Sequence, residues 1–160
     1  MSTRARPAAI RPTLTPSPAA AYRIPSDARS VGWARRELRR QLRIWGIDAE
    51  LSYTATLLLS ELVTNAVRAQ AARTPAAPTV GIRFAFSDGR LRLEVRDASD
   101  EQPVQYATQE DEECGRGLVL VDVLADGWGV TRHATGKTVW AELAVTGAVS
   151  VRRPDEPPRP

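Results

Sequence analysis

The sequence predicts an α+β fold, an α/β sandwich with helices packed on one face of a mixed, mostly antiparallel sheet. Apolar residues recur at helical spacing in two long segments before residue 72, which indicates two helices. Shorter strand-like segments, separated by glycine-containing turns, follow between residues 79 and 145. Helices and an antiparallel sheet of this kind bury their apolar faces against each other. The 160 residues are enough for one such core.

The first part of this region predicts a short strand and a helix. Residues 22–24 have the composition of an edge strand, and Pro25 ends it because proline has no N–H for a ladder hydrogen bond. Ser26 or Asp27 can cap a helix that runs to about Trp45, where a glycine follows. The apolar positions with helical spacing in this segment are Val31, Ala34, Leu38 and Leu42.

A second helix and a hairpin come next. Asp48 can cap a helix over residues 49–72, and two prolines mark the loop after it. Residues 79–86 and 91–97 are predicted to pair as a hairpin, since the turn sequence Ser87-Asp88-Gly89 lies between them.

The last third of the chain predicts a loop, a short helix and two strands. Residues 98–114 are polar and form the loop, and apolar helical spacing resumes over residues 118–124. Strands are predicted near residues 128–133 and 138–145, joined through Gly136.

The two ends of the chain differ from its centre in composition. Five of the 12 prolines lie in residues 1–25 and four in residues 147–160, which is typical of disordered segments. We predict a folded domain over residues 22–146, flanked by the tails 1–21 and 147–160. The two ends carry +4 and +1 of a total charge of +3, so residues 26–146 have a net charge of −2. An acidic centre argues against nucleic-acid binding.

Several features predict a cytoplasmic protein. Cys114 is the single cysteine, so no internal disulfide can form, as expected in a reducing compartment. The N-terminus has no apolar stretch of about 7–15 residues, as a secretory signal would. No apolar run is long enough to span a membrane. The 21 arginines against one lysine indicate a GC-rich coding sequence, as in actinobacteria.

The second predicted helix carries the first sign of a site. Glu61, Asn65 and Arg68 fall within roughly 60° of one another on a helix that is otherwise strongly apolar. A buried carboxylate or amide needs partners, because an unsatisfied buried polar group costs about 1–3 kcal/mol. A ligand or a metal ion in a cavity would supply them. The alternative is that these side chains are exposed on an amphipathic helix.

Two further features lie downstream. Residues 90–96 alternate charged and apolar side chains and end at Asp97. Gly115 and Gly117 precede an apolar helical segment, where backbone N–H groups can approach an anion at the helix N-terminus. Taken alone, the glycines can equally relieve a tight turn, and Asp97 can be a turn former.

In this order, the helix, the strand end and the glycine pair resemble the nucleotide-binding boxes of the GHKL (histidine-kinase-like) ATPase superfamily. The resemblance covers roughly residues 22–145 and is closest to the small bacterial anti-sigma factor serine kinases. Its most specific parts are Glu61-Leu62-Val63-Thr64-Asn65-Ala66-Val67 and Gly115-Arg116-Gly117-Leu118, with Gly136-Lys137-Thr138-Val139-Trp140 adding to them. It implies the histidine-kinase-like ATPase fold, with ATP and Mg²⁺ as cofactors.

The resemblance also implies a role for each of three residues, two at the phosphates and one at the base. Asn65 would ligate Mg²⁺ through its amide oxygen, since this ion prefers oxygen ligands. Glu61 would be the catalytic residue that accepts a proton from the attacking hydroxyl. Asp97 would accept a hydrogen bond from the exocyclic amine of adenine and so select ATP over GTP.

The other implied nucleotide contacts surround these three. Thr138 would place a hydroxyl near adenine, and Ser99 occupies a glycine position of the first box. Arg68 would contact phosphate, although a salt bridge or a solvated position is the alternative. The phosphates would meet the N–H groups of Gly115, Arg116, Gly117 and Leu118, and residues 98–114 would form a flexible lid.

The sequence departs from the family pattern after Asp97. The first glycine box usually reads Asp-x-Gly-x-Gly, but here Ser99 and Glu101 replace both glycines. Asp100 and Glu101 add negative charge near a polyphosphate. Ala69 stands where relatives often carry histidine. These departures bear more on kinase activity than on nucleotide binding.

Two functional classes follow. The protein is either an anti-sigma factor serine/threonine kinase that sequesters a sigma factor and phosphorylates an anti-anti-sigma (STAS-type) partner, or a catalytically weak, nucleotide-dependent protein-binding switch. The family implies a homodimer, formed through sheet edges or the first helix. A sensor histidine kinase is disfavoured because the chain has no phospho-acceptor histidine on a dimerisation helix and no membrane segment. A DNA-binding module is disfavoured by the acidic centre.

Overall fold

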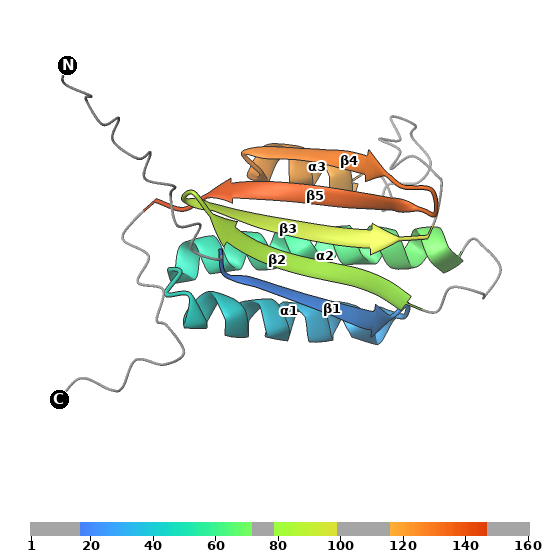
Figure 1. Ribbon diagram of the computed structural model, residues 1–160, viewed down its shortest axis with the longest axis horizontal. Coiled ribbons are helices and arrows are strands. Elements are labelled where there is room, and N and C mark those ends of the chain that lie inside the picture. Colours follow the sequence, from blue (N-terminus) through green and yellow to red (C-terminus); the bar gives the residue numbers. More distant parts are fainter. Residues whose placement is uncertain (1–16, 72–78, 99–115, 147–160) are drawn as a thin grey trace, which may run out of the picture.

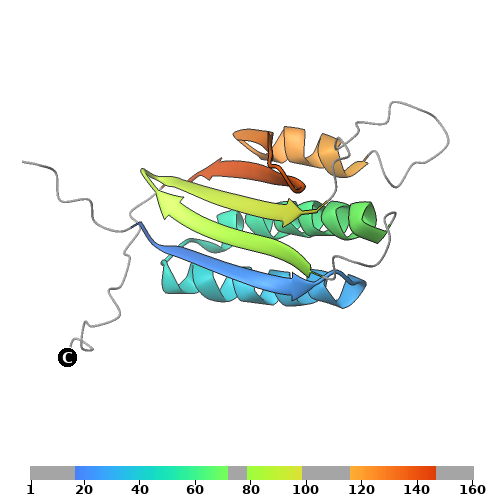
Figure 2. The same cartoon turned by 45° about the vertical axis from the view of Figure 1, so that its right-hand side comes forward.

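The computed structural model describes residues 17–71, 79–98 and 116–146. Along the chain lie β1 (Ala19–Pro25), α1 (Ala28–Ile44), α2 (Ala49–Ala71), β2 (Thr79–Ser87), β3 (Arg90–Asp97), α3 (Arg116–Leu124), β4 (Gly127–Arg132) and β5 (Lys137–Ala144). The five strands form one sheet in the order β1-β2-β3-β5-β4, and every neighbouring pair is antiparallel. The three helices cover one face of this sheet (Figures 1 and 2). The predicted α+β sandwich is confirmed, with no parallel pair among the described strands.

Side chains on alternate positions of the strands build the core. On β3, Leu91, Leu93 and Val95 are buried against the helices, and the intervening residues point to the opposite face. We call these the helix face and the outer face of the sheet. α2 packs against β3, β5 and both other helices. This central position of α2 explains why its sequence is apolar around most of the helix.

The helix caps agree with the sequence. Asp27 caps α1, because its Oδ1 accepts a hydrogen bond from the Ser30 amide at 3.0 Å, which decides between the two predicted caps. Asp48 Oδ1 accepts from the Leu51 amide at 2.9 Å at the start of α2. No helix in the described ranges is long and apolar enough to cross a membrane.

A cluster of hydrogen-bonded polar side chains links β1 to α1. The Tyr22 hydroxyl donates to Glu37 Oε1 at 2.5 Å, and Arg40 Nη2 lies 2.6 Å from the same oxygen. The hydrogen bonds from Arg40 lower the pKa of Glu37 to about 2. Burial, and then the bond to Glu37, raise the pKa of Tyr22. The Tyr22 ring also meets Trp33 edge-on, at 5.3 Å between centroids.

Gly136 is the point at which β5 begins its approach to β3. Its φ is +89°, and a Cβ at this position would collide with the Asp97 carbonyl oxygen and lie 2.6 Å from Ala98 Cα. Gly136→Ala therefore combines backbone strain with a clash against the neighbouring strand. We expect it to lower the free energy of unfolding by about 3 kcal/mol or more, measured by urea denaturation.

Two glycines of the same sheet serve as controls. Gly89 has a φ of +70°, and a Cβ there would have no atom within 4 Å, so Gly89→Ala should cost about 1 kcal/mol from strain alone. Gly127 has open space and no positive φ, so Gly127→Ala should change stability by less than about 0.5 kcal/mol. Equal losses of stability at all three positions would contradict the close approach of Gly136 to the backbone of Asp97 and Ala98.

Candidate nucleotide-binding site

The polar stripe of α2 lies half-buried in the helix layer. Glu61 and Asn65 are both of intermediate exposure and lie one turn apart on the same side of the helix. The buried residues of α2 are Ala55, Thr56, Leu58, Leu59, Leu62, Val63, Ala66 and Gln70. The prediction of a largely buried helix with one polar stripe is therefore confirmed.

Four elements meet at one end of the molecule. Figure 1 shows the C-terminal half of α2, the end of β3 and the start of β5 on the same side, and α3 begins at this end as well. Asp97 is the last residue of β3 and is only 3% exposed, on the helix face of the sheet. The fold thus brings the half of α2 that carries Glu61 and Asn65 to the same side as the end of β3, where Asp97 lies.

Asp97 has an ionic partner that the sequence reasoning missed. Lys137, the first residue of β5, is the register neighbour of Asp97. Its Nζ lies 3.3 Å from Asp97 Oδ1, and the two side chains are 4% and 2% exposed. A lysine buried to this degree is rare unless it is paired. The available signal was that Lys137 is the only lysine and stands beside Gly136 at a strand start.

Thr138 does not lie beside Asp97, which corrects the predicted position of its hydroxyl. Its register partners are Arg96 and Thr131, so its side chain belongs to the outer face. There its Oγ1 lies 2.8 Å from His133 Nε2, and both residues line a groove of about 440 Å³. Side chains alternate along a strand, so the position that faces Asp97 belongs to Lys137.

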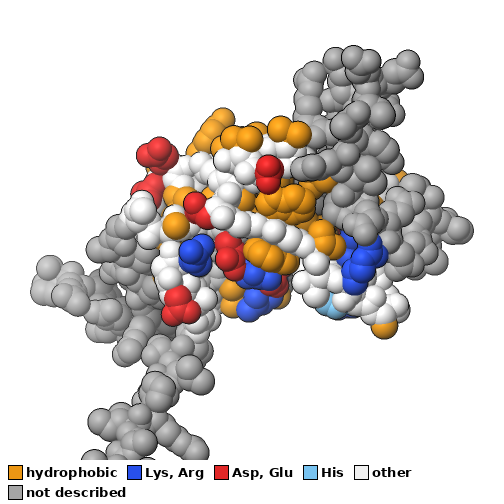
Figure 3. All heavy atoms as spheres, turned by 90° about the horizontal axis from the view of Figure 1, so that it is seen from above, with side chains coloured by type: hydrophobic (Ala, Val, Ile, Leu, Met, Phe, Trp, Pro, Cys, Tyr) orange, Lys and Arg blue, Asp and Glu red, His pale blue; other side chains and the backbone are white. Residues whose placement is uncertain are grey.

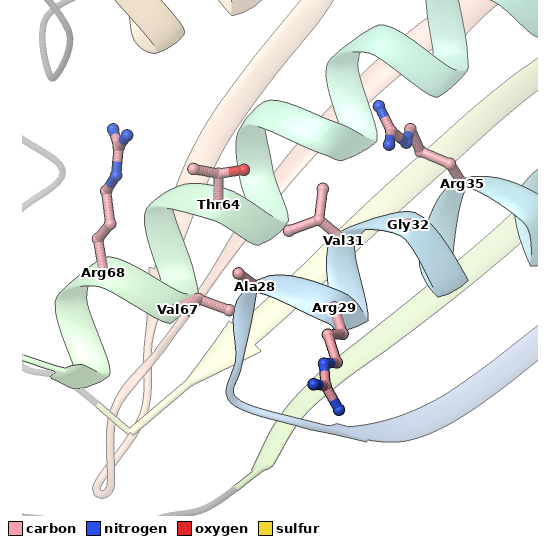
Figure 4. A pocket seen from close by; sticks show the side chains of 8 residues that line it. All are labelled: Ala28, Arg29, Val31, Gly32, Arg35, Thr64, Val67 and Arg68. Atoms are coloured by element: carbon pink, nitrogen blue, oxygen red, sulfur yellow. The ribbon is translucent and has the colours of Figure 1, made fainter.

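Arg68 lies on the α1 side of the polar stripe. It lines a cavity of about 470 Å³ between α1 and α2, together with Arg29 and Arg35 of α1 and Thr64 and Val67 of α2. Figure 4 shows the Arg68 side chain extending away from Arg29. Glu61, Asn65 and Asp97 do not line this cavity. Whether Arg68 contacts phosphate stays a prediction.

The glycine box is described only in part. Ser99 and Gly115 lie outside the described residues, as does most of the predicted lid. The backbone of Arg116 and Gly117 forms the first turn of α3, which begins two residues earlier than predicted. The Leu118 side chain is 2% exposed and packs inward, so only its backbone can reach a ligand. The first N–H groups of a helix have no partner within the helix, so this turn can bind an anion.

The charged residues of the outer face form a separate network. Arg92 contacts Glu94 and Glu142 at 2.7 Å each and stacks over the Trp140 ring at 4.1 Å. Figure 3 views the molecule from the side of β4 and α3 and shows acidic, basic and apolar side chains interleaved there. On α3, Val119 and Val123 remain exposed. Basic side chains outnumber acids on the outer face: the groove beside Thr138 is lined by Arg23, Arg83, Arg96 and His133, with Glu94 as its one acid.

Asn65 suits the way proteins bind Mg²⁺ with nucleotides. Among the residues that the structure describes, no three His, Cys, Asp or Glu side chains cluster closely enough to hold a metal ion. Mg²⁺ does not need such a cluster, because it is usually held by one or two protein oxygens, several waters and substrate phosphates. One amide oxygen on the half-buried stripe of α2 fits that arrangement.

The fold and the site define a protein class. Residues 24–143 match the family of histidine kinase-like ATPase domains, and the chain belongs to that family. Among solved structures, it is similar to the RsbU and RsbW domains of Rv1364c from Mycobacterium tuberculosis, with 21% sequence identity and a TM-score of 0.63. The match covers 81% of this chain and 32% of that one, so this chain spans about a third of its length. A comparison with curated proteins found no match.

Proposed function

We propose that the protein binds ATP at the end of the sheet where α2, β3, β5 and α3 meet, and that residues 22–146 make up the ATP-binding unit. The observation that carries this proposal is that the C-terminal half of α2, which includes the half-buried Glu61 and Asn65, lies on the same side as the end of β3, where Asp97 is buried. A histidine kinase-like ATPase domain implies nucleotide binding, which supports it further.

The proposed activity is that of an anti-sigma factor serine/threonine kinase. Glu61 would accept the proton of the attacking hydroxyl, either directly or through a water. Asn65 lies one turn away on the same stripe and would hold Mg²⁺. When bound, Mg²⁺ neutralises charge that develops on the transferred phosphoryl group. Positioning and charge neutralisation account for most of the catalysis of phosphoryl transfer.

The partners follow from the same likeness. The similar structure is named for RsbU and RsbW domains, and the match covers 81% of this chain. We propose that the protein is a homodimer that sequesters a sigma factor and phosphorylates an anti-anti-sigma protein of the STAS type. The net charge of −2 over residues 26–146 argues against direct nucleic-acid binding.

Glu61→Ala separates catalysis from binding. We expect the variant to bind Mg-ATP with the wild-type dissociation constant and to transfer phosphate at least about 100-fold more slowly, since a general base contributes roughly 10²–10⁴-fold. Binding is measured by calorimetry, and transfer is measured from labelled ATP to a STAS-type partner. Ser60→Ala, on the preceding position of α2, is the control and should leave both quantities unchanged.

Two outcomes would count against the kinase. Equal loss of binding and transfer in Glu61→Ala would remove the separate catalytic role of this carboxylate. Tight ATP binding by the wild-type protein without any transfer would favour the weak nucleotide-dependent switch, as the substitutions after Asp97 suggest.

A further inference from the structure

The groove of about 440 Å³ on the outer face of the sheet has no part in the proposed nucleotide site. Gly81 of β2 lies in it, with arginines on three sides. Arg23 is the register neighbour of Gly81 on β1, and Arg96 is its register neighbour on β3. Arg83 lies two positions further along β2 and therefore on the same face. We call the space over Gly81, between these three arginines, the Gly81 hollow.

The charge of the hollow is not balanced within the structure. Glu94 is the one acid that lines the groove, and it already contacts Arg83 at 3.3 Å and Arg92 at 2.7 Å. Neither Arg23 nor Arg96 forms an ion pair with any residue that the structure describes. Two exposed guanidinium groups thus remain available to an anion from outside.

The backbone does not require a glycine at position 81. Gly81 has no positive φ, and a Cβ there would meet the Arg96 Cβ at 3.5 Å, an ordinary contact. Glycine weakens the interior of a strand, and it often marks a place where a ligand approaches the backbone closely. Neighbouring strands lie about 4.8 Å apart, so roughly 10 Å separates the Cα atoms of Arg23 and Arg96, with no side chain between them.

We propose that this groove binds an acidic segment of a partner protein, with one carboxylate in the Gly81 hollow between Arg23 and Arg96. A guanidinium matches a carboxylate with two parallel hydrogen bonds, which makes arginine suited to this contact. Beyond Arg96 the groove reaches Thr138, whose hydroxyl lies 2.8 Å from His133 Nε2. A hydroxyl and an imidazole can bind uncharged polar groups of the same segment.

The groove fits a peptide better than other anions. Its volume lies in the range of about 300–1,000 Å³ that is typical of sites for whole ligands, which is more than one small anion fills. A nucleic acid carries a charge at every phosphate, whereas the cationic part of this groove is confined to one end. The inference goes beyond the proposed nucleotide binding and does not rest on it, because the groove and the nucleotide site lie on opposite faces of the sheet.

The test is a titration of the isotope-labelled full chain with a hexapeptide of alternating glutamate and serine, followed by amide chemical shifts in NMR spectra. We expect saturable changes that are largest at Gly81 and its register neighbours on β1 and β3. Arg96→Gln should raise the dissociation constant at least about fivefold, as the loss of a charged hydrogen bond does.

Arg90→Gln is the matched control. Arg90 is an exposed residue of β3 on the same face, but it does not line the groove. It lies about 20 Å along the strand from Arg96, beyond the screening length of about 10 Å in 0.1 M salt. The same loss of charge at this position should change the dissociation constant of the peptide less than about twofold.

Gly81→Val fills the hollow without removing a charge. Valine favours strands, so the variant should be at least as stable as the wild-type protein in urea denaturation. It should nevertheless bind the peptide at least about fivefold more weakly, because its side chain occupies the space of the carboxylate.

Several results would overturn the inference. These are wild-type affinity in both Arg96→Gln and Gly81→Val, shift changes confined to another surface, or no saturation at millimolar peptide. Inorganic phosphate that binds as tightly as the peptide would overturn it in favour of a small-anion site, and tighter binding of a single-stranded oligonucleotide would overturn it in favour of a nucleic-acid site. Mg-ATP binding is measured separately on the same samples, so failure of either proposal is recognised without the other.

Discussion

Asn65→Ala is expected to remove the stabilisation that Mg-ATP gives to the wild-type protein. A ligand at about 100 times its dissociation constant adds roughly 2.7 kcal/mol to the free energy of unfolding. For a chain of this size that is a rise in Tm of about 5–10 °C. The half-buried Asn65 amide supplies the oxygen proposed to ligate Mg²⁺, on the same stripe of α2 as Glu61. Its loss therefore removes the proposed protein ligand of the ion.

Thermal unfolding with and without Mg-ATP, Mg-ADP and EDTA measures this effect. Thr64→Ala is the matched control, because Thr64 is the neighbouring polar residue of α2 but lines the cavity toward α1 (Figure 4). Its ligand-induced rise in Tm should equal that of the wild-type protein. A full rise in Asn65→Ala would place the metal elsewhere. No rise in the wild-type protein at millimolar nucleotide would remove the nucleotide proposal.

Asp97→Ala is expected to be strongly destabilising even without nucleotide. It removes the carboxylate that lies 3.3 Å from the buried Lys137 ammonium. Breaking a buried ion pair by removing one partner costs about 3–5 kcal/mol, because the other charge stays in a poorly solvated place. Replacing both charges by apolar groups is often neutral. The double variant Asp97→Ala with Lys137→Met should therefore recover most of the lost stability.

Urea denaturation of the two single variants and the double variant measures the coupling between the two side chains. Arg83→Ala is the control, since it removes an ion pair with Glu94 in which Arg83 is 46% exposed. Exposed pairs are worth less than about 1 kcal/mol. If Asp97→Ala costs no more than Arg83→Ala, or if the double variant is as unstable as the single one, the pair is not buried in the way described.

The sequence predicted the elements well where periodicity and caps are strong. α2 has apolar residues around most of its circumference and one polar stripe, and Asp27 and Asp48 cap the two long helices as expected. Boundaries moved by up to three residues. α3 begins at Arg116 rather than at residue 118, and β1 begins at Ala19, inside the predicted tail 1–21, rather than at Tyr22. The end of β3 was predicted because the alternation from Leu91 stops at Asp97.

The error at Thr138 has a simple physical cause. A strand has a side-chain period of two, so shifting an assignment by one residue moves a side chain to the other face. The register of β5 against β3 pairs Lys137 with Asp97 and Thr138 with Arg96, which places Lys137 rather than Thr138 on the helix face. The apolar alternation of Val139, Ala141 and Leu143 indicates that Lys137 shares their face, but a lysine is ordinarily expected on the outer face.

The order of the strands also bears on how the chain folds. β1 is made first, but its partner in the described sheet is β2, which lies beyond both long helices in the chain. While the protein is being synthesised, α1 and α2 can pack only on each other and on β1 until Thr79–Ser87 emerges. Pairing β1 with β2 closes a long loop, and the entropy lost in closing it is offset only after the two strands have paired. We therefore expect this step to slow folding, as non-local pairing does in general. Until β2 has been synthesised, the apolar surfaces of α1 and α2 that later pack on the sheet stay largely exposed to water.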